Sequence, residues 1–366
     1  MSELALHNTL MQRLVRRVRK PWTRRIARKE LELHKLFAER LLVQLAHEGQ
    51  LGPVGEAPQI RSIARTRSDV VVALLGAGAS DAPQLVLKLP LTPDAERSTT
   101  GHRQVVVTLH ELPELRAFCS FVPRPIAWGD WQGRPYYLET ALPGVGAVDL
   151  VRQQAEPVLM KQDAARLILQ LHLGTLQRRV VDDALFARLA GQDLALLRRL
   201  SGGWPEATLL AQKLDLLEDL LDRQIAGREL PFSWTHGDFW PGNLLIEPST
   251  GAIGGVVDWD RASADQIPLH DLLHMLAYTR KLQRRSELGE EVVSYLLPAA
   301  FDRYERSLVK EAIELLDLPA TVEFFRAVTL LYWLRFAATN LERYPAFQRD
   351  SRWLKHNVFL VLKRGI

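Results

Sequence analysis

The chain has 366 residues, more than a single hydrophobic core usually organises, so two lobes or domains are expected. Its 47% hydrophobic and 25% charged residues are typical of a globular protein, and no apolar run reaches the ~18 to 20 residues of a membrane span. The single cysteine, Cys119, excludes an internal disulfide and a cysteine-rich metal site, which favours a cytoplasmic location.

Positive charge is concentrated at the N-terminus. Residues 1–30 carry nine Lys or Arg against two Glu, whereas the whole chain has a net charge of only +4. The rest of the chain is therefore slightly acidic, and binding of nucleic acid is not expected.

A helical extension is predicted over residues 1–50, with Pro21 in the first turn of its second helix. One face of this second helix is expected to be apolar and comprises Leu33, Phe37, Leu41 and Leu45. A basic amphipathic helix can dock on an anionic membrane or on a partner protein, or it can pack on the body of its own chain. The predicted location is therefore the cytoplasm, with peripheral association at the membrane left open.

Five short strands are predicted between the Gly- and Pro-rich linker at 51–59 and Gly146. They cover residues 60–66, 70–75, 85–89, 122–129 and 134–144. A helix is predicted between the third and fourth strands, at about residues 98–118, and Pro113 should end or kink it. Beyond Gly146 the pattern is mainly helical, so a small sheet is followed by a helical lobe.

An unusual set of polar residues follows in the segment THGDFWPGNLLIEPSTGAIGGVVDWD, residues 235–260. Two short strands around a Ser-Thr-Gly turn predict a hairpin that brings Asp258 back beside Asn243. Burying a polar side chain beside an apolar strand costs a few kcal/mol of folding free energy unless the side chain is paired or binds something. One carboxylate and one amide oxygen are typical ligands of Mg²⁺, which also keeps waters and binds substrate phosphates. Asp238 stands apart and could accept a proton from a hydroxyl.

The order His-Gly-Asp, four residues, Asn, then an apolar strand ending in Asp resembles the catalytic loop and metal motif of the aminoglycoside phosphotransferase and choline kinase superfamily. This superfamily shares the protein-kinase fold. LVLK at 85–88 resembles the family's third strand, and VPRPIAWG and YYLETALPG resemble its fourth strand and its fifth strand with the interlobe hinge. LQLH at 169–172 and ASADQIPLHDLLHM at 262–275 resemble further family signatures. The resemblance spans roughly residues 60–280.

The resemblance implies an α+β, bilobal, protein-kinase-like fold with a small antiparallel-sheet N-lobe and a mainly helical C-lobe. The expected domains are the extension at 1–50, a nucleotide-binding lobe at 51–140 and a helical lobe at 141–366. The last of these would carry the catalytic loop and the acceptor site.

The resemblance also assigns roles to single residues. Asp238 would be the catalytic base, Asn243 and Asp258 would bind Mg²⁺, and Lys88 would bind the nucleotide phosphates. Phosphoryl transfer requires mainly positioning and charge neutralisation, which such a set can supply.

Further residues are implied around the nucleotide. Val86 points the same way as Lys88 along the strand, so it would form the floor of the adenine pocket. Glu139 and Ala141 lie at the hinge, where backbone groups pair with adenine in this family. Ser68 lies in the phosphate-covering loop, which here reads Arg-Thr-Arg-Ser-Asp and lacks glycine.

One family feature is missing, namely the helix glutamate that should pair with Lys88. The aligned position lies near His102–Gln104, and the nearest acids are Glu96 and Glu111. The sequence does not identify which acid pairs with the lysine.

The predicted function is Mg²⁺-dependent transfer of the γ-phosphoryl group of ATP to a hydroxyl of a small molecule, a sugar or amino sugar. Residues 271–366 contain fifteen Lys or Arg and twelve Asp or Glu. This lack of acidic excess argues mildly against a polycationic aminoglycoside as the acceptor.

Two alternatives stay open. One is a catalytically inactive kinase-like scaffold that binds partners. The other is a metal-dependent phosphohydrolase, because HDLLH places two histidines one helical turn apart. Its site would comprise His236, Asp238, Asp258, His270 and Asp271. The family resemblance instead implies that Asp271 braces the catalytic loop.

Overall fold

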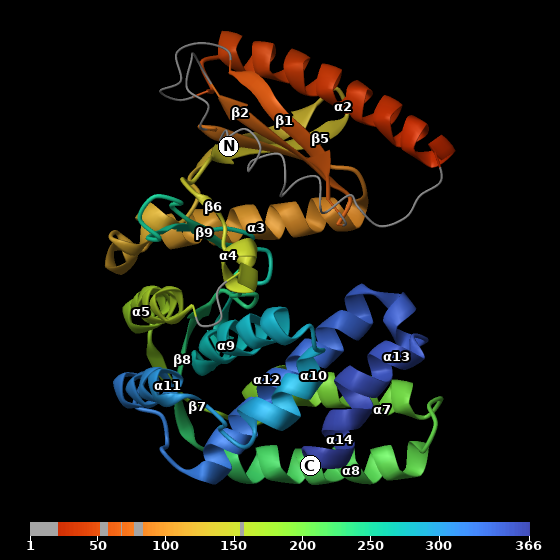
Figure 1. Cartoon of the computed structure of the whole chain (residues 1–366), viewed down its shortest axis with the longest axis vertical. Helices are drawn as coiled ribbons and strands as arrows, with labels where there is room; N and C mark the ends of the chain where they lie inside the picture. Colours follow the sequence, from red (N-terminus) through yellow and green to blue (C-terminus); the bar gives the residue numbers. More distant parts are fainter. Residues whose placement is uncertain (1–20, 52–57, 67, 77–82, 154–156) are drawn as a thin grey trace. The chain divides into compact units, whose positions relative to one another are not determined.

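The computed structural model describes residues 21–51, 58–66, 68–76, 83–153 and 157–366, with side chains from residue 29 onward. The chain divides into two compact units (Figure 1). The first comprises Met1–Ala147 and Asn243–Arg261, and the second comprises Val148–Gly242 and Ala262–Ile366. The domain limits expected from the sequence, at residues 50 and 140, stay predictions.

The first unit contains a five-stranded antiparallel sheet with the order β1-β2-β3-β5-β4. Its strands are β1 Gln59–Arg65, β2 Val70–Gly76, β3 Leu85–Pro90, β4 Pro125–Trp131 and β5 Arg134–Thr140. All five predicted strands are therefore confirmed. The predicted turn at 76–83 falls largely outside the described residues.

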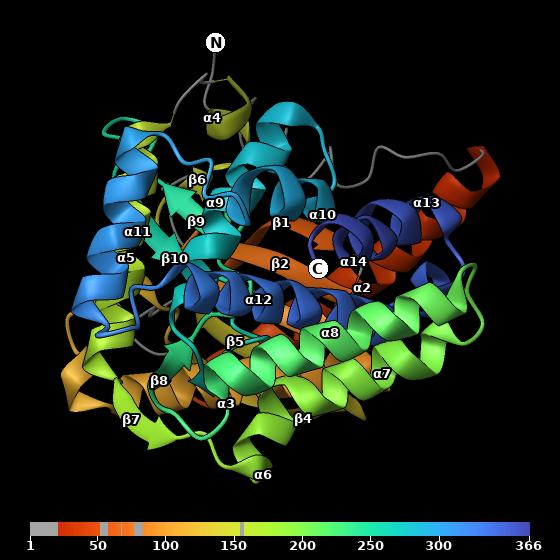
Figure 2. The ribbon, with the colours of Figure 1, turned by 90° about the horizontal axis from the view of Figure 1, so that it is seen from below.

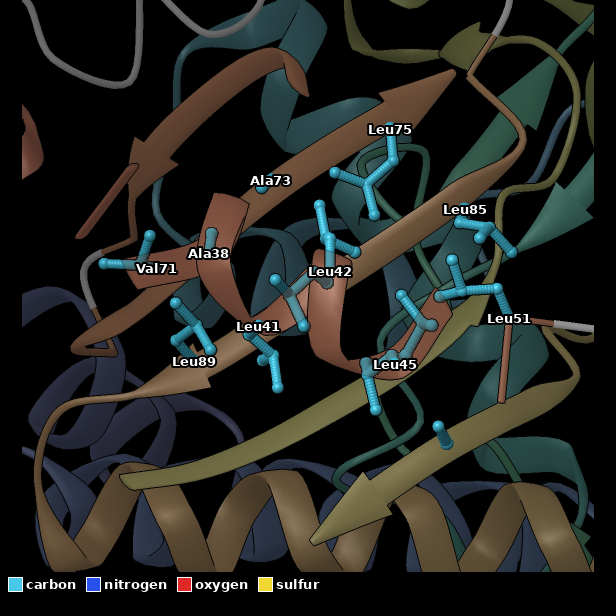
Figure 3. Packing of buried hydrophobic residues seen from close by; sticks show 13 residues of the cluster. Ala38, Leu41, Leu42, Leu45, Leu51, Val71, Ala73, Leu75, Leu85 and Leu89 are labelled. Atoms are coloured by element: carbon cyan, nitrogen blue, oxygen red, sulfur yellow. The ribbon is translucent and has the colours of Figure 1, made fainter. Parts of the chain in front are cut away.

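One face of this sheet is covered by helix α2, Pro21–His47 (Figures 1 and 3). The helix contributes Ala38, Leu41, Leu42 and Leu45, and β3 contributes Leu85, Leu87 and Leu89. Helix α2 thus packs on the body of its own chain. The first helix predicted for the extension lies outside the described residues. The predicted apolar face was partly wrong, because the side chain of Leu33 is 64% exposed. Leu33 lies five residues from Ala38, which is about 140° around a helix of 3.6 residues per turn.

The opposite face of the sheet is covered by helix α3, Pro93–Glu111. It begins earlier than predicted because Thr92 caps it, accepting a hydrogen bond from the Ala95 N–H at 3.2 Å, and Pro93 fits the first turn. It ends before Pro113, as predicted, and two 3₁₀ turns follow at Pro113–Leu115 and Phe118–Phe121.

A second, three-stranded sheet in the first unit has the order β10-β9-β6. Its strands are β6 Val145–Gly146, β9 Leu244–Ile246 and β10 Ile253–Val256. The hairpin of β9 and β10 confirms the one predicted from the sequence. Glycine is required here, because a Cβ on Gly254 would strike the carbonyl oxygen of Pro143 and a Cβ on Gly255 would strike Leu142. The hinge segment can therefore lie directly against the hairpin.

The second unit is mainly helical, as predicted. Its α-helices are α4 Val148–Gln153, α5 Val158–Gly174, α6 Asp183–Phe186, α7 Gln192–Ser201, α8 Ala207–Ile225, α9 Leu269–Arg284, α10 Leu288–Glu291, α11 Arg303–Leu315, α12 Val322–Arg343, α13 Ser351–Leu354 and α14 Leu360–Arg364. Three π-helical turns, at Ala187–Gly191, Val292–Leu296 and Lys355–Phe359, and a 3₁₀ turn at Pro345–Gln348 join them.

Helix α12 lies beside α7 and α8, with Trp333 fully buried (Figure 2). A three-stranded sheet of β7 Gln177–Val180, β8 Glu229–Thr235 and β11 Ser263–Gln266 was not predicted from the sequence. Within the described part of the chain, no helix has both the length and the apolar character needed to cross a membrane.

Candidate active site

Lys88 is held by a carboxylate from the neighbouring strand. In the register of β3 and β5, Val86 lies opposite Glu139 and Lys88 lies opposite Tyr137, so all four side chains share one face of the sheet. Lys88 Nζ lies 2.7 Å from Glu139 Oε1. The partner that the sequence did not identify is therefore Glu139, which had been assigned only a backbone role at the hinge.

His102 of α3 occupies the position where the family resemblance implied a glutamate. Its Nε2 lies 2.7 Å from Glu139 Oε2 and 3.2 Å from Lys88 Nζ. Its Nδ1 accepts a hydrogen bond from the Trp259 N–H at 3.1 Å. Burial opposes ionisation of Glu139, but the Lys88 ammonium and the His102 donor lower the pKa of this carboxyl to about 2. Glu139 is thus a buried carboxylate that fixes the lysine.

The turn between β1 and β2 lies where the family places its phosphate-covering loop. Asp69 adopts the left-handed backbone conformation, with φ of 57°, that a glycine would otherwise supply. The Arg65 guanidinium bonds Asp69 at 2.7 Å, and Thr66 Oγ1 accepts from the Val70 N–H at 3.1 Å. Ser68 Oγ lies 3.0 Å from Thr66 Oγ1, and the Ser68 side chain is exposed. A role of Ser68 in phosphate binding stays a prediction.

Of the residues expected to contact adenine, Val86 lies as predicted, whereas the backbone N–H of Ala141 is already hydrogen-bonded. Val86 is half-buried on the Lys88 face, as the alternation of the strand predicted. Ala141 donates its N–H to the Gln84 carbonyl at 2.8 Å, so this group is engaged within the sheet. An adenine at this hinge would have to pair with other backbone groups.

The hairpin places the two predicted Mg²⁺ ligands at its open end. The Val257 N–H donates to the Asn243 carbonyl at 3.0 Å, so Asp258 directly follows the residue paired with Asn243. The Asn243 side chain is buried, and Asp258 is exposed with φ of 68°. Aspartate adopts this left-handed conformation more readily than most residues, as Asp69 does in the β1–β2 turn. One amide and one carboxylate at the paired ends of two neighbouring strands fit Mg²⁺, which takes its remaining ligands from water and phosphate.

The residues after Asp258 anchor this end of the hairpin. The Trp259 side chain is fully buried, and its Nε1–H donates to the Val256 carbonyl at 2.9 Å. Asp260 accepts a hydrogen bond from the Ser98 hydroxyl of α3 at 2.6 Å. Asp260 therefore has a structural contact.

The loop that begins at His236, in the second unit, is braced by Asp271 of α9. This carboxylate accepts the N–H of His236 at 2.7 Å and that of Gly237 at 2.9 Å, and His172 Nε2 lies 3.0 Å away. Although burial opposes it, hydrogen bonding and charge from His172 lower the pKa of Asp271. The brace that the family resemblance implied for Asp271 is thus present.

Asp238 is held from both sides within this unit. Its N–H donates to His236 Nδ1 at 3.2 Å, and its Oδ1 lies 3.3 Å from His274 Nε2. His274 Nδ1 in turn lies 3.0 Å from the Tyr332 hydroxyl and its ring stacks on Tyr278 at 4.3 Å. His274 was not assigned to Asp238 from the sequence, although its spacing from Asp271 on one helix could have suggested that it lies close to the loop.

The contacts of the histidines do not support a hydrolase metal site. Within the described ranges, no three His, Cys, Asp or Glu side chains form a group that could hold a metal ion. His270 is buried, and burial lowers its pKa to about 4. Its ring lies 6.0 Å from that of Tyr332.

Both a family model and solved structures match this chain. The family model described as the phosphotransferase enzyme family matches residues 59–307. No curated protein matches the chain. A solved structure of a thermostable mutant of aminoglycoside phosphotransferase APH(4)-Ia, in its apo form, is similar over 84% of this chain and 96% of its own, with 14% identity and a TM-score of 0.52.

A second mutant of that enzyme was solved in a ternary complex with AMP-PNP and hygromycin B. It is similar over 88% of this chain and 99% of its own, with 14% identity and a TM-score of 0.51. These likenesses confirm the predicted α+β, protein-kinase-like fold.

Proposed function

Because this chain belongs to the phosphotransferase enzyme family, we propose that it transfers the γ-phosphoryl group of ATP to a hydroxyl of a sugar or amino sugar. The observation that carries the proposal is Lys88, fixed by the buried Glu139 carboxylate within the same unit as the Asn243–Asp258 hairpin. A fixed ammonium offers a preorganised charge to phosphate oxygens, the kind of stabilisation on which phosphoryl transfer depends.

Asn243 and Asp258 would hold Mg²⁺, which neutralises phosphate charge when it is bound. Lys88 would bind the phosphates, and the exposed Ser68 hydroxyl and the backbone of the β1–β2 turn would cover them. The half-buried Val86 would contact the base, with hinge groups near Glu139 and Ala141 beside it. The fold relative solved with AMP-PNP binds a nucleotide analogue, which supports a nucleotide as the donor.

Asp238 would orient the acceptor hydroxyl and accept its proton. The brace of Asp271 and the contact with His274 hold the loop and the carboxylate in place. A carboxylate positioned in this way can act as a general base.

A sugar or amino sugar is proposed as the acceptor because aromatic side chains lie near Asp238. The ring of His274 stacks on that of Tyr278, and the Trp240 ring lies 5.3 Å from Tyr278. Both Trp240 and Tyr278 are half-buried. Aromatic faces of this kind pack well against sugar rings. Tyr332 and Trp333 are buried in the core and do not contribute such a surface.

The test of this proposal is an assay of ADP release with panels of neutral sugars, amino sugars and phosphorylated sugars, each with and without Mg²⁺. We expect ADP release that depends on one acceptor class and on Mg²⁺, with a phosphorylated product seen by mass spectrometry. The Asp238→Asn variant should lose it while still binding ATP. Nucleotide binding without transfer to any hydroxyl acceptor would contradict the proposed reaction.

The N-terminal extension is proposed to bring this cytoplasmic enzyme to an anionic membrane surface. Helix α2 exposes Leu33, Leu36 and Val43 on the side away from its buried residues, and residues 1–30 are strongly basic. Deleting residues 1–20 should reduce flotation with anionic vesicles and leave catalysis unchanged. Equal flotation of the shortened protein would exclude docking by this segment.

A further inference from the structure

His102 connects two parts of the first unit that the proposed function uses separately. Its Nε2 contacts Glu139, which holds the phosphate-binding Lys88. Its Nδ1 contacts the backbone N–H of Trp259, the residue after Asp258. One imidazole ring therefore touches both the lysine assembly and the turn that carries a proposed Mg²⁺ ligand.

The two contacts define the tautomer of the ring. Because the Trp259 N–H donates to Nδ1, that nitrogen carries no proton, and the proton of the neutral ring must be on Nε2. Nε2–H then donates to Glu139 Oε2, while Lys88 donates to Oε1. The 3.2 Å approach of Lys88 Nζ to His102 Nε2 joins two donors and is not a hydrogen bond. Glu139 thus receives one donor on each oxygen.

The surroundings leave the ring little freedom. His102 is 2% exposed, and its ring meets the Tyr137 ring edge-to-face with centroids 5.5 Å apart. Ser98, four residues earlier and so on the same face of α3, bonds Asp260. The helix is therefore attached to the turn at the two residues that directly follow Asp258.

We propose that His102 is a positioning residue that supports both the orientation of Lys88 and the conformation of the Asp258 turn, through one nitrogen for each. This inference rests on the proposed function. It replaces the direct helix glutamate–lysine ion pair with a relay in which β5 supplies the carboxylate and α3 supplies a neutral donor and acceptor. The support of Lys88 and the support of the turn therefore depend on different nitrogens of one ring.

The two roles can be separated by substitution, because asparagine and glutamine imitate different nitrogens of histidine. In His102→Asn the side-chain oxygen can accept from the Trp259 N–H, as Nδ1 does, but the amide is too short to reach Glu139. In His102→Gln the side-chain nitrogen can donate to Glu139, as Nε2–H does, but the acceptor near Trp259 is lost. A residue that merely fills space would not distinguish the two variants.

The experiment measures two quantities for each variant, namely the Kd for ATP in EDTA and the Mg²⁺ concentration for half-maximal turnover. A lost buried hydrogen bond costs ~1 kcal/mol or more, which is about fivefold or more in an equilibrium constant. We expect His102→Asn to weaken ATP binding by about that factor with a nearly unchanged Mg²⁺ requirement. We expect His102→Gln to raise the Mg²⁺ requirement with nearly unchanged ATP binding.

A matched control is available on the same helix. His110 bonds the Pro123 carbonyl at 3.1 Å, away from the lysine and the turn, so His110→Gln should change neither quantity. Equal losses of both quantities in the two His102 variants, or wild-type values in both, would overturn the assignment of one nitrogen to each support.

A measurement without any ligand separates this inference from the proposed function. In ¹⁵N-histidine-labelled protein, His102 should give the NMR signals of the neutral tautomer protonated at Nε2. A ring protonated at Nδ1 would overturn the assignment even if the protein is an active kinase. Absence of nucleotide binding by the wild-type protein, with the expected tautomer present, would count against the proposed function and against the role of His102 in it.

Discussion

Replacing Glu139 with glutamine should destabilise the protein at neutral pH, and by an amount that shrinks on acidification. The pKa of this carboxyl falls from the ordinary 4.5 to about 2 in the folded protein. At 1.4 kcal/mol per pH unit, the ionised form stabilises the fold by about 3 kcal/mol relative to the neutral form. Because the pKa is lowered by folding, this contribution is present above pH 4.5 and is lost as the pH falls through 2.

The assay is urea unfolding of wild type and Glu139→Gln at pH 7, 4 and 3. The difference in the free energy of unfolding should be about 3 kcal/mol at pH 7 and roughly 1 kcal/mol at pH 3. ATP affinity in the variant should also fall, since Lys88 loses its carboxylate. Glu114→Gln, which alters an exposed carboxyl of the same unit, is the matched control and should show no such difference. A difference that stays constant with pH would refute the assignment of a buried, ionised Glu139.

Three further predictions address the second unit. Asp238→Ala should lower turnover by about 10²-fold or more and leave the Kd for ATP nearly unchanged, as loss of a base would; an equal loss in ATP binding would contradict that role. Tyr278→Ala should raise the KM for the acceptor about tenfold with no change in the KM for ATP. The control variant Tyr344→Ala, at a more exposed residue, should change neither constant. An unchanged acceptor KM in Tyr278→Ala would exclude the aromatic surface as part of the acceptor site. The pKa of His270 falls from 6.5 to about 4 on burial, so acidification from pH 6.5 to 4 should cost the fold about 3 kcal/mol through this group, and His270→Gln should show a correspondingly smaller loss in urea unfolding.

Features set by local patterns were predictable from the sequence. The strands of the first sheet, the end of α3 before Pro113 and the hairpin that pairs β9 with β10 all follow from alternation, turn residues and proline. The direction of Lys88 followed from its position in the strand. The brace at Asp271 was expected only from the family resemblance. Asp271 contacts residues far from it in the sequence, and local patterns do not predict such contacts.

Features set by pairing across the fold were not predictable. Glu139 meets Lys88 only because β3 and β5 pair with Val86 opposite Glu139, and a shift of one residue would turn Glu139 to the other face. His102 contacts Glu139 only because α3 packs on that face of the sheet, and the sequence does not predict this packing. The short strands of β7, β8 and β11 were missed because they are far apart in the sequence and carry little periodicity of their own. Helices separate β7 from β8, and the β9–β10 hairpin separates β8 from β11.

The conformation of the turn at Ser68 could not be predicted from the absence of glycine. The missing glycine suggested a departure from the family's phosphate-covering loop. The structure shows that Asp69 takes the left-handed conformation and bonds Arg65, so the turn forms without glycine. Aspartate tolerates this conformation better than most residues, because its short polar side chain can form local hydrogen bonds.

The first unit is proposed to bind a Mg²⁺–nucleotide complex through Lys88 and the Asn243–Asp258 hairpin. The most direct test of this binding is a thermal-shift titration with ATP, with and without Mg²⁺, on wild type, Asp258→Ala and the hairpin control Glu247→Ala. At a hundred times its Kd, a ligand of the native state adds roughly 2.7 kcal/mol, which is a clear shift. Wild type and Glu247→Ala should show a Mg²⁺-dependent shift, and this shift should disappear in Asp258→Ala. The same shift in all three proteins would contradict the metal assignment, and no shift in wild type would contradict the nucleotide site itself.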